Sequence, residues 1–387
     1  MQEIVLQDPN PWDREVDLLR KELDIDNKKA MYHVDRGMKG LNRGLGNGLA
    51  KINRYLYGTH RGRYYLIGAD SGVGKTTLTD FMYVYNLFKA CEELSIPLDI
   101  LYFSFEISVI MKKGRWISML YFLKYGETIP TDLVYGWTAD PSRVMTADQY
   151  AKVKVISEEV ERIFSKIRFV ETSVTPYRMF DMMLHRAGAY GDLVKNASKA
   201  SGPSAYVGYK NNTPDVVKVT VVDHLALADD MGKGLKASMD LASSLFVKAR
   251  NLWDETVVVI QQFNTELQSA SREHKHEMAY VPTRQDLGDS RYTYRDADVV
   301  LGLTKPVDYQ LTKLREYTEL SKWGKYFLQL HIMKNRYGGG TGDFVPLFNN
   351  PIAGVPEELP SQATGWNALL QDQYIAKAAE LTKLSAY

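Results

Sequence analysis

Short apolar runs alternate with longer segments of helical periodicity along most of the chain. The runs are rich in β-branched and aromatic residues, and each has the length of a buried strand. This alternation predicts an α/β fold, in which a mostly parallel sheet is covered by helices on both faces. The predicted strands are 63–69 (RYYLIGA), 98–104 (LDILYFS), 166–172 (KIRFVET), 216–223 (VVKVTVVD), 256–263 (TVVVIQQF), 298–303 (DVVLGL) and 326–334 (YFLQLHIMK).

Two local patterns add detail to this sheet. Apolar residues at helical spacing, from Leu78 to Tyr85, predict a helix directly after the first strand. The run 342–350 (GDFVPLFNN) follows a triple glycine and predicts a closing antiparallel hairpin.

The predicted sheet lies in one domain between an arm and a tail. Residues 1–50 form the arm, in which Asn10-Pro11 starts a helix that lies against either the chain's own core or a neighbouring subunit. Residues 51–350 form the domain, and its stretch 192–215, rich in Ser, Gly, Asn and Pro, is interpreted as a flexible insertion. Residues 351–387 form a polar tail that ends in a helix.

Composition excludes several classes of protein. The 48 Lys and Arg nearly balance the 47 Asp and Glu, which excludes a uniformly basic coat for nucleic acid but not a local basic stripe. The single cysteine, Cys91, cannot form an internal disulfide or a cysteine-based zinc site, as is typical of a reducing compartment. The first 25 residues carry charges where a signal peptide is apolar, and the apolar runs are too short to span a bilayer. A soluble cytoplasmic protein without a membrane partner is expected.

A phosphate-binding loop is predicted between the first strand and its helix. The segment from Ala69 to Thr76 fits the G-x-x-x-x-G-K-[ST] pattern, with alanine at the first glycine. Gly72 and Gly74 allow backbone N–H groups to turn toward phosphate oxygens, Lys75 can reach the β- and γ-phosphates, and the Thr76 hydroxyl can ligate Mg²⁺. An ordinary glycine-rich turn is the alternative. The predicted nucleotide-binding residues are Ala69, Asp70, Ser71, Gly72, Val73, Gly74, Lys75, Thr76 and Thr77.

Other strands end in polar side chains, and ligands in open parallel sheets bind at the carboxyl ends of strands. Asp223 is the expected magnesium carboxylate, or else an ordinary aspartate in a turn. Glu106 is placed to orient and deprotonate an attacking water, or else is a glutamate favoured by a helix N-terminus. Gln262, after Gln261, can contact the γ-phosphate and a neighbouring loop, or else is a buried polar strand end.

The last strand leads into Lys334 and Arg336, and its polar end is expected at the same edge as the phosphate loop. If this strand lies at the far edge of the sheet, the pair could instead reach across a subunit boundary as an arginine finger. A solvated basic turn is the alternative.

Together these motifs resemble the DnaB-type replicative helicases, hexameric ATPases of the RecA fold and helicase superfamily 4. Phe103-Ser-Phe-Glu-Ile107 is similar to that family's Phe-Ser-Leu-Glu-Met segment, with Glu106 at its catalytic glutamate. Asp286-Leu-Gly-Asp-Ser290, followed by Asp296-Ala-Asp298, resembles its Asp-Leu-Arg-Glu-Ser and Asp-Ala-Asp segments. Lys334-Asn-Arg336 matches the Lys-x-Arg pair that acts on the neighbouring subunit's ATP. The resemblance covers residues 36–350.

The chain also departs from the family pattern. Only a short arm precedes the core, where the family carries a helical domain. This difference bears on whether a primase docks on the protein, and it suggests a phage or plasmid version of the helicase. His224 and Ala226 replace the usual Tyr and Gln beside the magnesium aspartate, and Thr265 replaces an Arg. These substitutions bear on whether ATP hydrolysis is coupled to DNA, and they leave the ATP chemistry intact.

The resemblance implies an ATP-dependent DNA helicase: a homo-hexamer with a RecA-like motor domain and with ATP and Mg²⁺ at each subunit boundary. Its catalytic residues would be Lys75, Glu106, Gln262, Lys334 and Arg336, and its partners single-stranded DNA and a primase or helicase loader. Two alternatives are a RecA- or KaiC-like recombination or repair ATPase and an ATP-gated assembly scaffold without unwinding activity. Loops facing the channel of such a ring would supply the DNA contacts, namely Lys233, Lys236, Arg272, Lys275 and Arg284.

Overall fold

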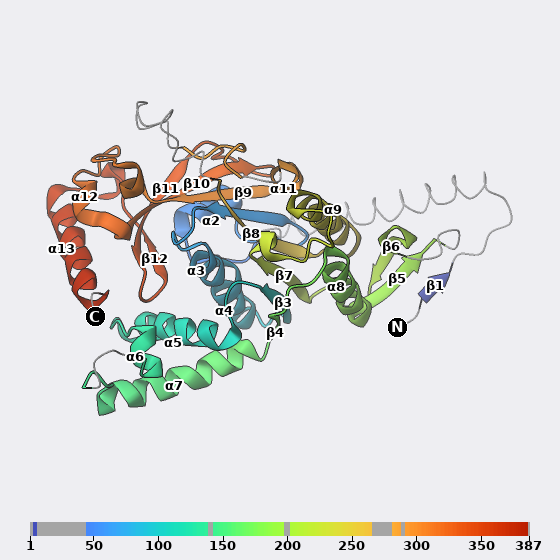
Figure 1. Ribbon diagram of the computed structural model, residues 1–387, viewed down its shortest axis with the longest axis horizontal. Coiled ribbons are helices and arrows are strands. Elements are labelled where there is room, and N and C mark those ends of the chain that lie inside the picture. The colour runs from blue at the N-terminus through green and yellow to red at the C-terminus, as the bar shows by residue number, and fades with distance from the viewer. Residues whose placement is uncertain are drawn as a thin grey trace.

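A nine-stranded sheet forms the centre of the computed structural model, which describes residues 3–5, 44–137, 142–196, 202–264, 281–287 and 291–385 (Figure 1). Its strand order is β12-β11-β10-β9-β2-β8-β7-β3-β4. The pairs from β9 to β4 are parallel, and β10, β11 and β12 continue the sheet antiparallel. The strands are β2 (Tyr64–Ala69), β3 (Leu98–Ser104), β4 (Ile167–Val170), β7 (Val217–Asp223), β8 (Thr256–Gln262), β9 (Val299–Thr304), β10 (Phe327–Asn335), β11 (Phe344–Asn350) and β12 (Val355–Glu358).

The predicted α/β fold with a mostly parallel sheet is confirmed. Each predicted run coincides with a strand, and β10 and β11 form the predicted hairpin. The strand β12 was not predicted, and it places part of the expected tail in the sheet. The expected arm helix lies outside the described residues.

Helices cover both faces of the sheet, which explains why its strands are mostly apolar on both faces. In β2, Tyr65 and Ile67 pack on one face, and Tyr64 and Leu66 pack on the other. No helix in the described ranges is both long and apolar enough to cross a membrane. The first face carries α2 (Ala50–Leu56), α3 (Lys75–Thr79), a π-helical turn (Asp80–Tyr85), α4 (Asn86–Glu93), α5 (Val109–Tyr125), α6 (Thr131–Tyr135) and α7 (Ala147–Phe164). The second carries α8 (Pro176–Tyr190), α9 (Leu235–Trp253) and α11 (Arg291–Asp296).

A separate aromatic core joins the C-terminal helices to the antiparallel part of the sheet. Helices α12 (Leu320–Trp323) and α13 (Ala368–Ser385) lie at the left end in Figure 1. Trp323 is fully buried there between Phe327 of β10 and Tyr374 of α13, with ring centroids 5.5 and 5.9 Å away. The predicted terminal helix is therefore confirmed, and it packs on the domain.

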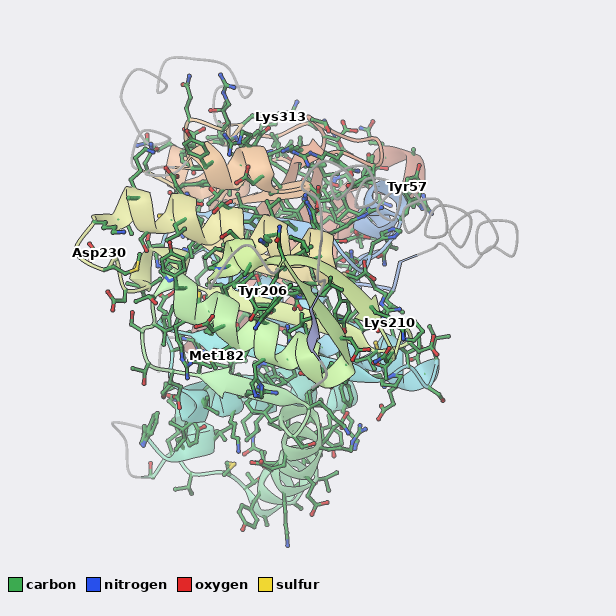
Figure 2. All side chains as sticks on the ribbon, turned by 90° about the vertical axis from the view of Figure 1, so that its right-hand side faces the viewer. Tyr57, Met182, Tyr206, Lys210, Asp230 and Lys313 are labelled. Carbon is green, nitrogen blue, oxygen red and sulfur yellow. The ribbon has the colours of Figure 1, made fainter. Side chains whose placement is uncertain are left out.

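The expectation of a flexible insertion at 192–215 is wrong for most of that stretch. Strands β5 (Gly191–Lys195) and β6 (Tyr206–Asn211) pair antiparallel, and β1 (Glu3–Val5) adds to β5 in parallel. The hairpin is held because Tyr209 packs against α8 and α9 and its hydroxyl donates to the Ala187 carbonyl across 3.0 Å. Figure 2 looks onto this small sheet, with Tyr206 on β6 and Met182 on the neighbouring α8. Sparse apolar residues among Ser, Gly and Asn are enough to fix it.

Candidate functional site

The glycine loop connects β2 to α3 in the backbone conformation that a phosphate cradle requires. Gly72 and Gly74 have φ values of +73° and +106°, a region that favours glycine. A Cβ built on either residue would meet no atom within 4 Å, so the loop leaves open space in front of α3. Lys75 is buried, and its Nζ donates to the Asp70 carbonyl across 3.0 Å. The loop can therefore present N–H groups and an ammonium to an anion.

A hydrogen bond from a residue distant in the chain also holds this loop. The Tyr309 hydroxyl, in the turn after β9, donates to Oδ2 of Asp70 across 2.9 Å. Sequence reasoning did not single out Tyr309, because nothing in the motif indicates a partner so distant along the chain. This hydrogen bond fixes one end of the loop independently of any bound ligand.

Thr76 and Asp223 meet in front of the loop. Asp223 ends β7, and its Oδ1 accepts a hydrogen bond from the Thr76 hydroxyl across 2.9 Å. Burial raises the pKa of Asp223, and the ammonium of Lys112 opposes that rise. Within the described residues, no group of three His, Cys, Asp or Glu side chains could hold a metal ion. A phosphate-bound Mg²⁺ needs only a hydroxyl and a carboxylate beside phosphate and water oxygens, so this pair fits it.

Glu106 lies in the turn between β3 and α5, at the same edge. The turn is fixed because the Phe105 N–H donates to the Asp223 carbonyl across 2.8 Å. Burial lowers the pKa of Lys75, and the negative charges of Glu106, Asp223 and Asp70 oppose that shift. Glu106 is exposed to solvent, as a group that activates a water requires.

The two glutamines that end β8 differ in their surroundings. Gln262 lies opposite Ala69 in the parallel register, beside the start of the glycine loop, and is exposed. Gln261 is buried; its amide donates to the Leu287 carbonyl, and its oxygen accepts from Thr293 across 2.7 Å. Gln261 thus links the strand end to the segment before α11, while Gln262 leaves an exposed side chain beside the glycine loop.

The expectation that Lys334 and Arg336 share an edge with the phosphate loop is wrong. Because β10 runs antiparallel to β9, its last residue, Asn335, lies opposite Val299 at the start of β9. Apolar periodicity does not report strand direction, which is why the sequence did not distinguish the two edges. The alternative supposed that this strand lies at the far edge of the sheet; β10 instead lies two strands in from that edge, and its direction is what places the pair away from the glycine loop.

Within the chain, this basic pair holds the end of α11. Lys334 Nζ donates to the carbonyls of Tyr294 and Ala297 across 2.8 and 2.7 Å. The Arg336 guanidinium pairs with the buried Asp298 across 3.1 Å. Burial lowers the pKa of Lys334 to about 8, and the positive charge of Arg336 lowers it further in the same direction.

The proposed nucleic-acid contacts are exposed where they are described. Lys233 lies in the turn before α9, which Asp230 marks in Figure 2. Lys236 in the first turn of α9 pairs with Asp240 across 2.6 Å, and Arg284 is exposed in the segment 281–287. Arg272 and Lys275 lie outside the described residues.

Comparison with known proteins identifies the fold. No protein-family model matches the chain, and no curated protein matches it by sequence. A solved structure described as the ATPase domain of G40P has a TM-score of 0.61 and 16% identity, covering 86% of this chain and 98% of that one. A DnaB-like replicative helicase, described with its interactions with primase, has a TM-score of 0.60 and 17% identity; the match covers 86% of this chain and 66% of that one. The expected resemblance to DnaB-type ATPase domains is confirmed as a RecA-like α/β fold.

Proposed function

We propose that this protein is an ATP-dependent DNA helicase motor of DnaB type. The observation that carries the proposal is the meeting of Thr76 and Asp223 in front of an open glycine loop, with Lys75 and Glu106 at the same edge. The likeness of the fold to helicase ATPase domains supports it. ATP and Mg²⁺ are the ligands that these side chains would take.

The residues divide the work of ATP hydrolysis among them. Glycine-loop N–H groups and Lys75 bind and orient the phosphates, and Thr76 with Asp223 would hold Mg²⁺, which neutralises charge on the phosphate oxygens. Glu106 accepts the proton of the attacking water. Gln262, beside the loop, senses whether the γ-phosphate is present.

Completion of the site requires a second subunit. Lys334 and Arg336 lie at the strand ends opposite their own glycine loop, so the ATP on which their positive charge would act is that of a neighbour. A head-to-tail ring, a homo-hexamer as in the DnaB type, places one subunit's basic pair near the next subunit's phosphates. Single-stranded DNA would then be held electrostatically by Lys233, Lys236 and Arg284 from each subunit.

The test is ATP hydrolysis with and without single-stranded DNA, followed by strand displacement on a forked duplex. A helicase shows DNA-stimulated hydrolysis and ATP-dependent displacement. Stimulated hydrolysis without displacement would favour a RecA- or KaiC-like recombination or repair ATPase, and hydrolysis indifferent to DNA would favour an assembly scaffold. Lys75→Ala, which removes the phosphate-binding ammonium, is the negative control in every assay.

A further inference from the structure

A buried polar network lies directly behind Asp223, on the side away from the glycine loop. At its centre is Lys112 of α5, which is 1% exposed. Its Nζ lies 3.6 Å from Oδ2 of Asp223 and 3.1 Å from Oδ2 of Asp80, and donates to the Tyr102 hydroxyl across 2.8 Å. Tyr102 in turn donates to Oδ1 of Asp80 across 2.8 Å. Trp116 Nε1 donates to Oδ2 of Asp80 across 3.0 Å.

The two oxygens of Asp223 therefore have different partners. Oδ1 faces the glycine loop and accepts from Thr76 across 2.9 Å, whereas Oδ2 faces Lys112 and the Tyr102 hydroxyl, 3.4 Å away. A carboxylate held from behind cannot rotate freely about its last bond. The network thus fixes the orientation of the carboxylate, with one oxygen facing the loop.

Lys112 also connects two elements at this edge of the sheet. It lies in the first turns of α5, a helix that Ser108 caps only two positions after Glu106. Its side chain reaches from there to Asp223 at the end of β7. The same side chain therefore ties the start of α5 to the end of β7.

Stability alone does not explain such a network. Two carboxylates and one ammonium lose their hydration when buried, and apolar residues of similar volume usually stabilise a core at least as well. Asp80 lies in the π-helical turn Asp80–Tyr85, an irregularity often found at functional sites. The arrangement is better explained by the orientation that it imposes.

We propose that Lys112 is a positioning residue for the metal-binding carboxylate, held in place by Asp80, Tyr102 and Trp116. By pairing with Oδ2 it fixes the orientation of the Asp223 carboxylate, whose other oxygen, on the side of Thr76, would hold the Mg²⁺ of a bound nucleotide. This inference rests on the proposed function, because it concerns the same site. Groups behind a metal ligand typically change metal affinity by about 10- to 100-fold when removed.

The experiment titrates Mg²⁺ against a fluorescent ATP analogue bound to the full chain. Two variants are compared with the wild type: Lys112→Met, and the double variant Asp80→Asn/Lys112→Met, which keeps hydrogen-bonding groups and relieves the charge left behind. Lys218→Met is the matched control, since it removes another buried lysine from the opposite end of β7. Binding of the analogue in EDTA measures the affinity of the glycine loop for the nucleotide in the absence of the metal.

The expected result is a midpoint for Mg²⁺ raised about 10- to 100-fold in both Lys112 variants, with unchanged affinity in EDTA and an unchanged midpoint in Lys218→Met. A wild-type midpoint in the folded double variant overturns the inference while leaving the proposed function intact, and this variant decides if Lys112→Met alone does not fold. Loss of affinity in EDTA as well would mean a structural role and also overturns it. Absence of Mg²⁺-dependent binding by the wild type overturns both proposals.

Discussion

The Thr76 hydroxyl donates a hydrogen bond to Oδ1 of Asp223 across 2.9 Å, joining residues 147 positions apart in the chain. It connects the first turn of α3 to the end of β7, so the glycine loop and the carboxylate form one rigid edge. Hydroxyl and carboxylate oxygens are ligands that Mg²⁺ accepts, so these two residues would hold the ion of a bound nucleotide.

Removing the charge of this carboxylate should abolish catalysis without unfolding the protein. Asp223→Asn keeps the volume and a hydrogen-bond acceptor for Thr76 but loses the anionic ligand. We expect steady-state ATP hydrolysis in Mg²⁺ to fall at least about 100-fold, the order of magnitude lost with a group that stabilises transition-state charge. Asp254→Asn, at a left-handed position (φ +60°) that asparagine tolerates, is the control and should retain full activity. Near-normal turnover of Asp223→Asn would remove Asp223 from the site.

The placement of the basic pair predicts complementation between subunits. Glu106→Gln and Arg336→Ala should each be inactive alone, because each removes one half of every composite site. Mixed assemblies should recover part of the ATPase activity, since some boundaries then combine an intact Glu106 with an intact Arg336. Activity is measured across a series of mixing ratios after subunit exchange, confirmed by labelled subunits. A flat, inactive series with proven exchange would refute action in trans.

The lowered pKa of Lys334 predicts a pH dependence in the alkaline range. With a pKa of about 8 in the folded protein and 10.5 as the ordinary value, the folded chain binds fewer protons than the unfolded chain between these limits. The contribution of this group to stability therefore rises as the pH rises through about 8, because the folded state no longer carries a poorly solvated charge.

Activity should change in the opposite direction. A neutral Lys334 cannot stabilise phosphate charge, so hydrolysis should decline above about pH 8. Lys334→Arg, which stays protonated throughout this range, should flatten the decline. Parallel ATPase and urea-unfolding measurements from pH 7 to 10 check both signs. An identical decline in the arginine variant would assign the effect to another group.

A buried ion pair far from the site predicts a large loss of stability. Arg186 of α8 and Glu255 before β8 contact each other with no exposed side-chain surface, and Arg186 also donates to the Val219 carbonyl across 2.9 Å. Arg186→Met should lower the free energy of unfolding by about 3–5 kcal/mol, because it leaves the Glu255 charge buried and unpaired. The half-exposed pair Arg162–Glu92 offers the contrast, since Arg162→Met should change the free energy of unfolding by about 1 kcal/mol or less. Equal losses in urea titrations would contradict this assignment.

The parts of the site that were predicted from the sequence are those encoded locally. The glycine loop needs particular residue types at fixed spacing, and Asp223 and Glu106 follow continuous apolar runs whose ends mark the ligand edge of a parallel sheet. Likewise, β2 and β7 are buried on both faces and are mostly apolar, so they are recognisable without any tertiary information.

The parts that were missed depend on tertiary contacts. The direction of β10 follows from its hairpin with β11. The hairpin of β5 and β6 is held in place because Tyr209 packs against neighbouring helices. The network around Lys112 joins side chains of the π-helical turn Asp80–Tyr85, β3, α5 and β7. No residue spacing within one segment indicates it. Such side chains look like isolated polar residues until the elements that carry them are brought together.

The two edge strands of the large sheet are both short and poorly suited to main-chain pairing. β4 and β12 have four residues each. β12 contains Pro356, which has no N–H, and Glu358, whose carboxylate is engaged by the N–H groups of Lys51 and Ile52. A second copy therefore gains little by extending the sheet, a route that also leads to aggregation. Copies that associate near this sheet would meet through side chains and loops, so subunits could separate and reassemble without either of its edge strands leaving the sheet.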